Sequence, residues 1–187
     1  MALLTVENCM ARVPQAATAS LGIMEDVIAE AQGLADGACG RVLESANYTE
    51  YHDIGSGQTL VALRQSPVTG TPAVYTDANT TIPTTLTDCT SYTLDTDAGI
   101  LASTGAFPSG PRNLLVTYTA GYTAATCPAG LRRVLYQIVG WILESAGNSG
   151  AASEGQDGYN VTYEELRDGL PLSLWAALQP WRKVVVG

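Results

Sequence analysis

The chain contains very little positive charge. It has nine Lys and Arg residues against eighteen Asp and Glu in 187 residues, which gives a formal net charge of −9. Lys183 is its single lysine. A groove that binds nucleic acid needs clustered Lys and Arg side chains that displace counterions from the phosphates. The sequence therefore predicts no such groove, and any contact with DNA would be passage rather than binding.

Metal-binding and membrane signals are missing as well. The four cysteines, Cys9, Cys39, Cys89 and Cys127, are widely spread and form no CxxC pair, which argues against a zinc ribbon and favours reduced, structural thiols. No apolar run approaches the ~18 residues that cross a bilayer. The first residues lack the basic stretch and long apolar run of a signal peptide. We expect a soluble protein made in a cytoplasm, with no membrane contact.

The common catalytic motifs are also absent. The sequence has no GxSxG, HExxH, EF-hand or GxGxxG pattern. Its single histidine, His52, lies beside Asp53 in a predicted strand without an activated serine, and is interpreted as a surface residue. Glu164 and Glu165 are adjacent and cannot share a helix face. We therefore expect no catalytic residue, no metal ligand, no cofactor and no enzymatic activity.

The residues that are present suit a folded protein. Hydrophobic residues make up 46% of the chain and charged residues only 14%, which supports a core and is too little charge for a disordered chain. The length favours one domain over residues 1–187. Low charge also indicates that much of the surface is covered by something other than water.

Residues 1–45 read as helical. Thr5 can cap a short helix over Val6–Val13, which Pro14 ends. Ser20 opens a longer helix, and Gly40 is suited to its end. Apolar residues recur along this helix at helical spacing: Ile23, Val27, Ala31, Leu34 and Ala38.

Residues 46–123 read as β structure, rich in Thr, Tyr, Pro and Gly. The stretch NYTEYHDIGSGQTLVALR, residues 47–64, predicts a hairpin of two strands around a glycine turn. Further strands are expected in AGILAS and in NLLVTYTAGY. The fold class predicted from this order is α+β, a small helical bundle with an inserted antiparallel β-rich region.

A second helical region begins at Pro128, a favourable first residue for a helix over 128–146. One apolar stripe of this helix consists of Leu131, Val134, Leu135, Ile138 and Ile142. A second stripe consists of Tyr136, Val139, Gly140 and Leu143. A helix that is apolar on two sides is buried on both, either within the chain or against a neighbouring subunit. Tyr136, Val139 and Leu143 are thus candidates for a subunit interface.

The last part of the chain combines a predicted loop, a helix and an arm. Residues 147–160 are rich in Gly, Ser and Ala, which indicates a flexible loop. Residues 161–187 are expected to hold a short helix from Pro171 and a strand-like arm. The candidate partner-docking residues in this region are Leu174, Leu178, Trp181, Val184, Val185 and Val186. Packing of Trp181 on the chain's own core is the alternative.

The order of these segments resembles a known family. The stretches that carry the resemblance are ANYTEYHDIGSGQTLVALRQSPV, FPSGPRNLLVTYTAGY, CPAGLRRVLYQIVGWIL and LPLSLWAALQPWR. In this order they are similar to the head–tail connector proteins, also called adaptor or head-completion proteins, of long-tailed bacteriophages. The Thr-rich segment at about 69–91 departs from the pattern, as a larger β insertion than is usual.

The resemblance implies a structural virion protein at the head–tail junction. It implies a homo-oligomeric ring, typically dodecameric, beneath the portal protein of the capsid, made in the bacterial host cytoplasm. Such a ring extends the DNA channel, through which DNA passes without specific binding, and presents a platform to the next neck or tail-completion protein. It implies no catalysis. Two alternatives stay open: another neck or tail-completion protein, and a β-containing domain that binds a small ligand or acts as an enzyme.

Overall fold

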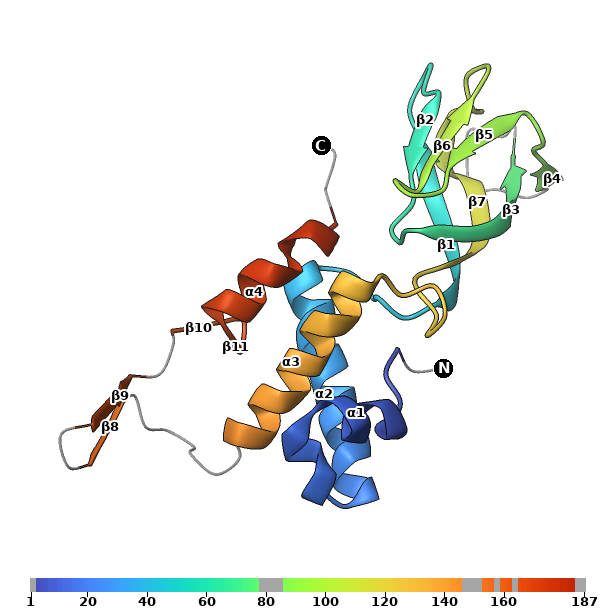
Figure 1. Cartoon of the computed structure of the whole chain (residues 1–187). Helices are drawn as coiled ribbons and strands as arrows, with labels where there is room; N and C mark the ends of the chain where they lie inside the picture. The colour runs from blue at the N-terminus through green and yellow to red at the C-terminus, as the bar shows by residue number, and fades with distance from the viewer. Residues whose placement is uncertain (1–2, 78–85, 146–152, 157–158, 163–164, 184–187) are drawn as a thin grey trace. The chain divides into compact units, whose positions relative to one another are not determined.

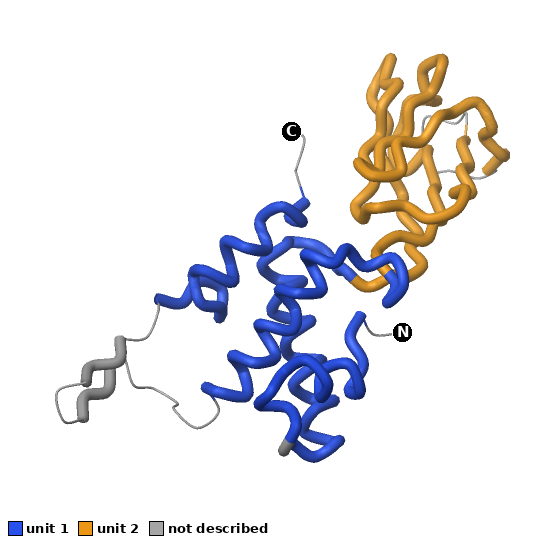
Figure 2. The backbone as a smooth tube through the Cα atoms, viewed as in Figure 1, with its two compact units in different colours: residues 1–43, 123–184 blue, residues 44–122, 185–187 orange. Residues whose placement is uncertain are grey.

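A computed structural model of the chain describes residues 3–77, 86–145, 153–156, 159–162 and 165–183. These residues form two compact units, which Figure 2 colours separately. Residues 3–43 and 123–183 make up a helical unit, and residues 44–122 make up a β unit. The β unit is thus inserted between two parts of the helical unit, as the α+β prediction expects, and the fold class is confirmed.

The described residues of the helical unit form four α-helices and two short 3₁₀ helices (Figure 1). In chain order they are α1 (Val6–Arg12), a 3₁₀ helix (Pro14–Thr18), α2 (Leu21–Cys39), α3 (Ala129–Ser145), α4 (Leu172–Leu178) and a 3₁₀ helix (Gln179–Trp181).

Local capping signals define where these helices begin and end. The Thr5 hydroxyl accepts a hydrogen bond from the Asn8 backbone N–H at 3.2 Å, which satisfies one of the free donors of the first turn. Ser20 is the N-cap of α2. Gly40 ends that helix with φ at +64°, a conformation that a residue with a Cβ adopts at a cost. These three predictions are confirmed.

The core of the helical unit forms where α2 and α3 pack together. The predicted stripe of α3 is confirmed, because Leu131, Val134, Leu135, Ile138 and Ile142 are all buried. From α2 the buried side chains are Met24, Val27, Ile28, Ala31, Ala35, Ala38 and Cys39. The predicted stripe of α2 is thus right for Val27, Ala31 and Ala38 and wrong for Ile23, which is exposed. Each helix therefore presents one apolar face inward, which is the arrangement that stabilises amphipathic helices.

The β unit consists of two antiparallel sheets. One has the strand order β1-β7-β3-β4 and the other β2-β6-β5. The first sheet is built from β1 (Ala46–Ile54), β7 (Gly110–Ala120), β3 (Val68–Thr76) and β4 (Thr87–Asp88). The second is built from β2 (Leu60–Ala62), β6 (Ile100–Ser103) and β5 (Tyr92–Asp95). Both sheets contribute to one apolar cluster, with Leu101 and Val116 fully buried in it.

The predicted hairpin over residues 47–64 is wrong. β1 pairs with β7, and β2 pairs with β6, so the two neighbouring strands lie in different sheets. β2 has only three residues, whereas β1 has nine and β7 eleven. The long strands form a more extended ladder with each other than either could form with β2. The segment between β1 and β2 closes on itself, because the Gln58 side chain accepts from the Gly55 N–H at 2.9 Å.

The β unit begins and ends at one joined pair of backbone segments. Glu44 and Tyr122 form an isolated parallel bridge, and the Ser45 N–H donates to the Tyr122 carbonyl at 2.8 Å. Gly121 has φ at +106°, and a Cβ there would lie 2.5 Å from the Glu44 carbonyl oxygen. Glycine is therefore required at 121 for two reasons, its backbone angle and the proximity of the opposite strand.

The C-terminal region carries two short hairpins. β8 (Ser153–Gln156) pairs with β9 (Tyr159–Thr162), and β10 (Leu166–Arg167) pairs with β11 (Leu170–Pro171). The loop predicted over 147–160 is thus wrong for residues 153–156, 159 and 160, which belong to paired strands. The Gly/Ser/Ala composition concealed the pairing, because strand pairs take their stability partly from backbone hydrogen bonds that carry no side-chain signature. The arm residues 184–187 lie outside the described residues.

Candidate functional site

A groove of about 670 Å³ lies on the helical unit. Its walls come from the end of α1, the 3₁₀ helix that follows and the outer side of α3. Three of the eight arginines lie in the groove, which we call the arginine groove. Its principal lining residues are Arg12, Arg132, Arg133, Tyr136, Trp141 and Glu144.

The groove forms where the end of α1 packs against the outer side of α3. On α3 the groove residues recur at spacings of three and four, on the side away from the buried stripe of Leu131, Leu135 and Ile138. Pro14 ends α1 at this level, and a Cβ on Gly140 would lie 3.5 Å from Val13 Cγ1. The end of α1 thus packs against α3 at Gly140 and forms one wall of the groove.

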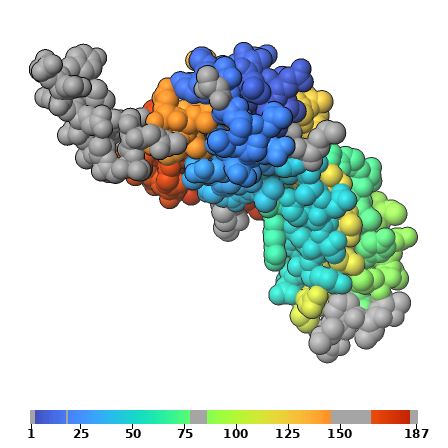
Figure 3. All heavy atoms as spheres, turned by 90° about the horizontal axis from the view of Figure 1, so that it is seen from below, coloured from blue at the N-terminus to red at the C-terminus, as the bar shows by residue number. Residues whose placement is uncertain are grey.

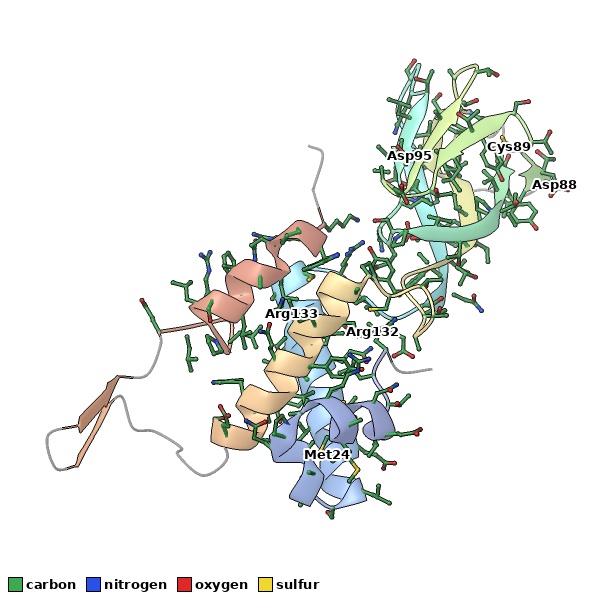
Figure 4. All side chains as sticks on the ribbon, in the orientation of Figure 1. Met24, Asp88, Cys89, Asp95, Arg132 and Arg133 are labelled. Atoms are coloured by element: carbon green, nitrogen blue, oxygen red, sulfur yellow. The ribbon has the colours of Figure 1, made fainter. Side chains whose placement is uncertain are left out.

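The three arginine side chains of the groove differ in their contacts with the rest of the chain. Arg132 Nη2 donates to the backbone carbonyls of Ala124 and Cys127, at 2.6 and 3.1 Å. The guanidinium of Arg12 lies 5.7 Å from the ring centroid of Tyr136, a cation–π distance. Arg133 is exposed, and Figure 4 labels it beside Arg132 on α3. Arg132 thus has a structural role, whereas the positive charge of Arg133 faces solvent.

Two further groups complete the groove. Burial is the largest effect on the Tyr136 phenol and raises its pKa, so the ring is a neutral surface at physiological pH. At the far end of α3, the Glu144 carboxylate accepts a hydrogen bond from the Gln15 side-chain amide. The acidic group is thus tied to a neutral partner, and the arginines determine the sign of the charge in the rest of the groove. Such a surface can bind an acidic, partly apolar partner.

The candidate docking residues near the C-terminus are placed as follows. Leu178 is fully buried in the helical unit, so its side chain is not available to a partner. Leu174 and Trp181 are half-buried. The Trp181 ring lies against Gly130 on α3, where a Cβ would come within 3.1 Å of it. This face of the Trp181 ring therefore packs within the chain itself, which was the alternative to docking on a partner. Val184, Val185 and Val186 lie outside the described residues.

The candidate subunit-interface residues on α3 are similarly divided. Val139 is fully buried among α3's inward residues, and this burial within the chain removes it from the candidate surface. Leu143 and Tyr136 are half-buried, and Tyr136 lines the arginine groove. The second apolar stripe was therefore not one surface: part of it belongs to the core and part to the groove.

The β unit contains a buried polar cluster that sequence reasoning missed. The Glu50 carboxylate accepts from the Tyr118 hydroxyl and from the Arg64 N–H, the latter at 3.1 Å, and His52 Nε2 lies 3.1 Å away. Burial alone would raise the pKa of Glu50, but the hydrogen bonds from His52, Tyr118 and Arg64 outweigh it and lower that pKa. Burial and the Glu50 bond raise the pKa of Tyr118 strongly.

This cluster is suited to a structural role. An ionised Glu50 accepts hydrogen bonds and a protonated Tyr118 donates one, so neither group is poised to exchange a proton near neutral pH. The interpretation of His52 as a plain surface residue is incomplete, because its ring nitrogen contacts a buried carboxylate. Glu50 and His52 are two residues apart in β1, so their side chains point to the same face of the strand. This spacing was the signal in the sequence that could have indicated the contact between them.

Within the described residues, no group of three or more His, Cys, Asp or Glu side chains could hold a metal ion. The described helices include none with the length and apolar character needed to span a membrane.

Comparison with known proteins gives a clear structural match. Over 98% of this chain and 91% of the other, the structure is similar to a chain from the neck of an empty GTA particle computed with C6 symmetry, with a TM-score of 0.65 and 15% identity. A chain from the virion of a native gene transfer agent (GTA) particle matches with the same coverage and TM-score at 17% identity. A chain from the neck of a native GTA particle computed with C12 symmetry gives 0.61 and 14%, over 97% and 89% of the two chains.

The chain shares its fold with these gene transfer agent proteins. Both the helical unit and the inserted β unit take part in the match, because nearly the whole chain is covered. No protein-family model and no curated protein sequence matches. At 14–17% identity the similarity lies in the fold.

The arginine groove was not predicted from the sequence. Arg132 and Arg133 were visible as an adjacent basic pair in a chain with few cations, and this was the signal that could have indicated it. Arg12 is more than a hundred residues away in sequence, and only the packing of α1 against α3 brings it to the same surface.

Proposed function

We propose that this chain is a structural component of the neck of a phage-like particle, where copies assemble into a ring between head and tail. The observation that carries the proposal is the match of nearly the whole chain to neck and virion chains of gene transfer agent particles. Two of those assemblies were computed with C6 and C12 symmetry, which is consistent with a closed ring of identical chains.

The proposed role extends to partners in the particle. One side of the ring contacts the portal protein and the other the next neck or tail-completion protein, and twelve copies surround the DNA channel. The net charge of −9 supports passage of DNA without retention, because an acidic wall does not hold phosphates. The role is one of assembly and requires no catalysis.

The C-terminal segment is the proposed attachment to the portal. Leu174 and Trp181 keep part of their apolar surface exposed on the helical unit, and Val184, Val185 and Val186 follow in sequence after Arg182 and Lys183. Together they supply an apolar surface of the kind that docks in a partner's groove or adds a strand to its sheet.

Electron microscopy tests the proposal directly. The full chain is mixed with the portal protein of the same particle and examined by negative staining. We expect rings of this chain attached to the portal. The absence of both rings and portal binding at high protein concentration would contradict the neck assignment. Removal of residues 184–187 should leave the melting temperature unchanged and weaken the attachment, whereas an unchanged attachment would remove the arm from the proposal.

A further inference from the structure

The charge of the arginine groove is unusual for this chain. Arg12 and Arg133 are exposed, and Arg132 lies beside them, so a third of all basic residues lie in one concavity of a protein with net charge −9. Tyr136 and Trp141 add half-buried aromatic surface. A partner that fits this groove carries carboxylates next to apolar side chains.

The outer face of α2 has the matching composition. Ile23, Asp26 and Glu30 follow one another at spacings of three and four, on the side opposite the buried Met24, Ile28 and Ala31. We call these three residues the outer stripe. Ile23 is 53% exposed, and α2 contains no Lys or Arg. Among the described residues, neither Asp26 nor Glu30 makes an ion pair or side-chain hydrogen bond.

The two surfaces lie on separate parts of the same unit. The arginine groove is formed by α1, the following 3₁₀ helix and α3, and it includes no residue of α2. The spheres of the N-terminal helices, coloured blue in Figure 3, form a continuous outer surface of the helical unit. One copy can therefore use both surfaces at once, each toward a different neighbour.

We propose that the outer stripe of one copy docks in the arginine groove of the next copy, with Asp26 and Glu30 facing Arg12 and Arg133. This inference rests on the proposed function, and it names the contact that closes the ring. A patch that meets a different patch on the neighbour is the heterologous contact that cyclic assemblies require. Opposite charge determines the register and orientation of the two surfaces, while Ile23 against Tyr136 or Trp141 buries apolar area.

The test reverses one charge on each surface. In Arg133→Glu the groove loses one of its two exposed cations, and in Asp26→Arg the outer stripe loses a carboxylate. Both residues are exposed, so neither change should affect folding, which melting curves verify. Sedimentation velocity over a concentration series at low ionic strength should show association of each variant weakened at least about tenfold, since like charges then oppose each other.

A mixture of the two variants gives the decisive result. Arg133→Glu has a groove with a carboxylate at the altered position and a native stripe, whereas Asp26→Arg has a native groove and a less acidic stripe that carries a cation. When the variants alternate around a ring, every groove faces a stripe of opposite charge at the altered positions. We expect the equimolar mixture to associate more tightly than either variant alone. Failure of the mixture to recover association would overturn the pairing.

Controls separate this contact from net charge and from other occupants of the groove. Arg112→Glu and Asp97→Arg make the same changes in net charge at exposed positions of the β unit, and they should associate like the wild type. Tight binding of an acidic portal segment or of duplex DNA that Arg133→Glu abolishes, without effect on self-association, would assign the groove to that ligand instead. Rings that persist unchanged in both variants would overturn this inference and leave the neck function standing. A wild-type chain that forms no assembly, alone or with portal, would contradict both.

Discussion

The hydroxyl of Tyr118 on β7 donates to the carboxylate of Glu50 on β1, and both side chains are buried. The Gln65 N–H in turn donates to the Tyr118 oxygen at 3.1 Å, so the phenol connects the β1–β7 ladder to the segment that follows β2. Removal of one partner from such a network leaves a buried charge with fewer donors, which costs more than an ordinary hydrogen bond contributes.

Tyr118→Phe is therefore expected to destabilise the chain. The substitution keeps the ring and removes only the hydroxyl, so we expect a loss of about 2 kcal/mol in the free energy of unfolding, typical of a hydrogen bond to a charged group. Urea denaturation followed by circular dichroism measures it. Tyr51→Phe is the matched control, because Tyr51 is exposed and no hydrogen bond to its hydroxyl is described. Equal effects of the two substitutions would contradict the role assigned to Tyr118.

The same carboxylate makes stability depend on pH. The pKa of Glu50 is lowered in the folded chain, whereas in the unfolded chain it returns to its ordinary value near 4.5. The unfolded state therefore binds the proton more readily, and the stabilisation is complete above pH 4.5 and is lost as the pH falls toward the folded pKa. Melting temperatures measured between pH 7 and pH 3 should fall less steeply for Glu50→Gln than for the wild type. Parallel curves would show that other carboxyl groups dominate.

Substitution at Gly121 tests the junction of the β unit. An alanine there would adopt φ at +106° and place its Cβ 2.5 Å from the Glu44 carbonyl oxygen, a backbone atom that cannot move away cheaply. We expect Gly121→Ala to lower the free energy of unfolding by about 2 kcal/mol or more. Gly105→Ala should change it by less than about 0.5 kcal/mol, since nothing lies within 4 Å of the added methyl. Thermal melts of the two variants make the comparison.

The parts of the fold that the sequence predicted correctly are those set by neighbouring residues. Thr5, Ser20 and Gly40 act on their own helix ends, and the buried stripe of α3 repeats within one helix. The pairing of β1 with β7 joins segments about seventy residues apart, and a nearer strand offered an equally plausible partner in the sequence. The arginine groove required the same kind of distant contact, between α1 and α3.

Thiol reactivity should report the packing of both units. Burial raises the pKa of the Cys9 and Cys39 thiols to about 11, and it also raises that of Cys127. Since the thiolate is the reactive form, these three should react with a thiol reagent at pH 8 only after denaturation. Cys89 is free and half-buried, so it should account for the reaction of the native chain, and Cys89→Ser should abolish it. Rapid labelling of several thiols in the native protein would contradict the described core.

Two leucines of α4 distinguish the core from a docking surface near the C-terminus. Leu178 is fully buried, and the Cys39 thiol lies 3.8 Å from its carbonyl oxygen, whereas Leu172 on the same helix is 43% exposed. Leu178→Ala removes buried methyl groups and should cost about 2–5 kcal/mol in the free energy of unfolding. Leu172→Ala should cost less than about 0.5 kcal/mol. Portal attachment, measured for both variants below their melting temperatures, should be unchanged by Leu178→Ala. If Leu178→Ala melted normally but no longer attached to the portal protein, Leu178 would instead belong to the docking surface.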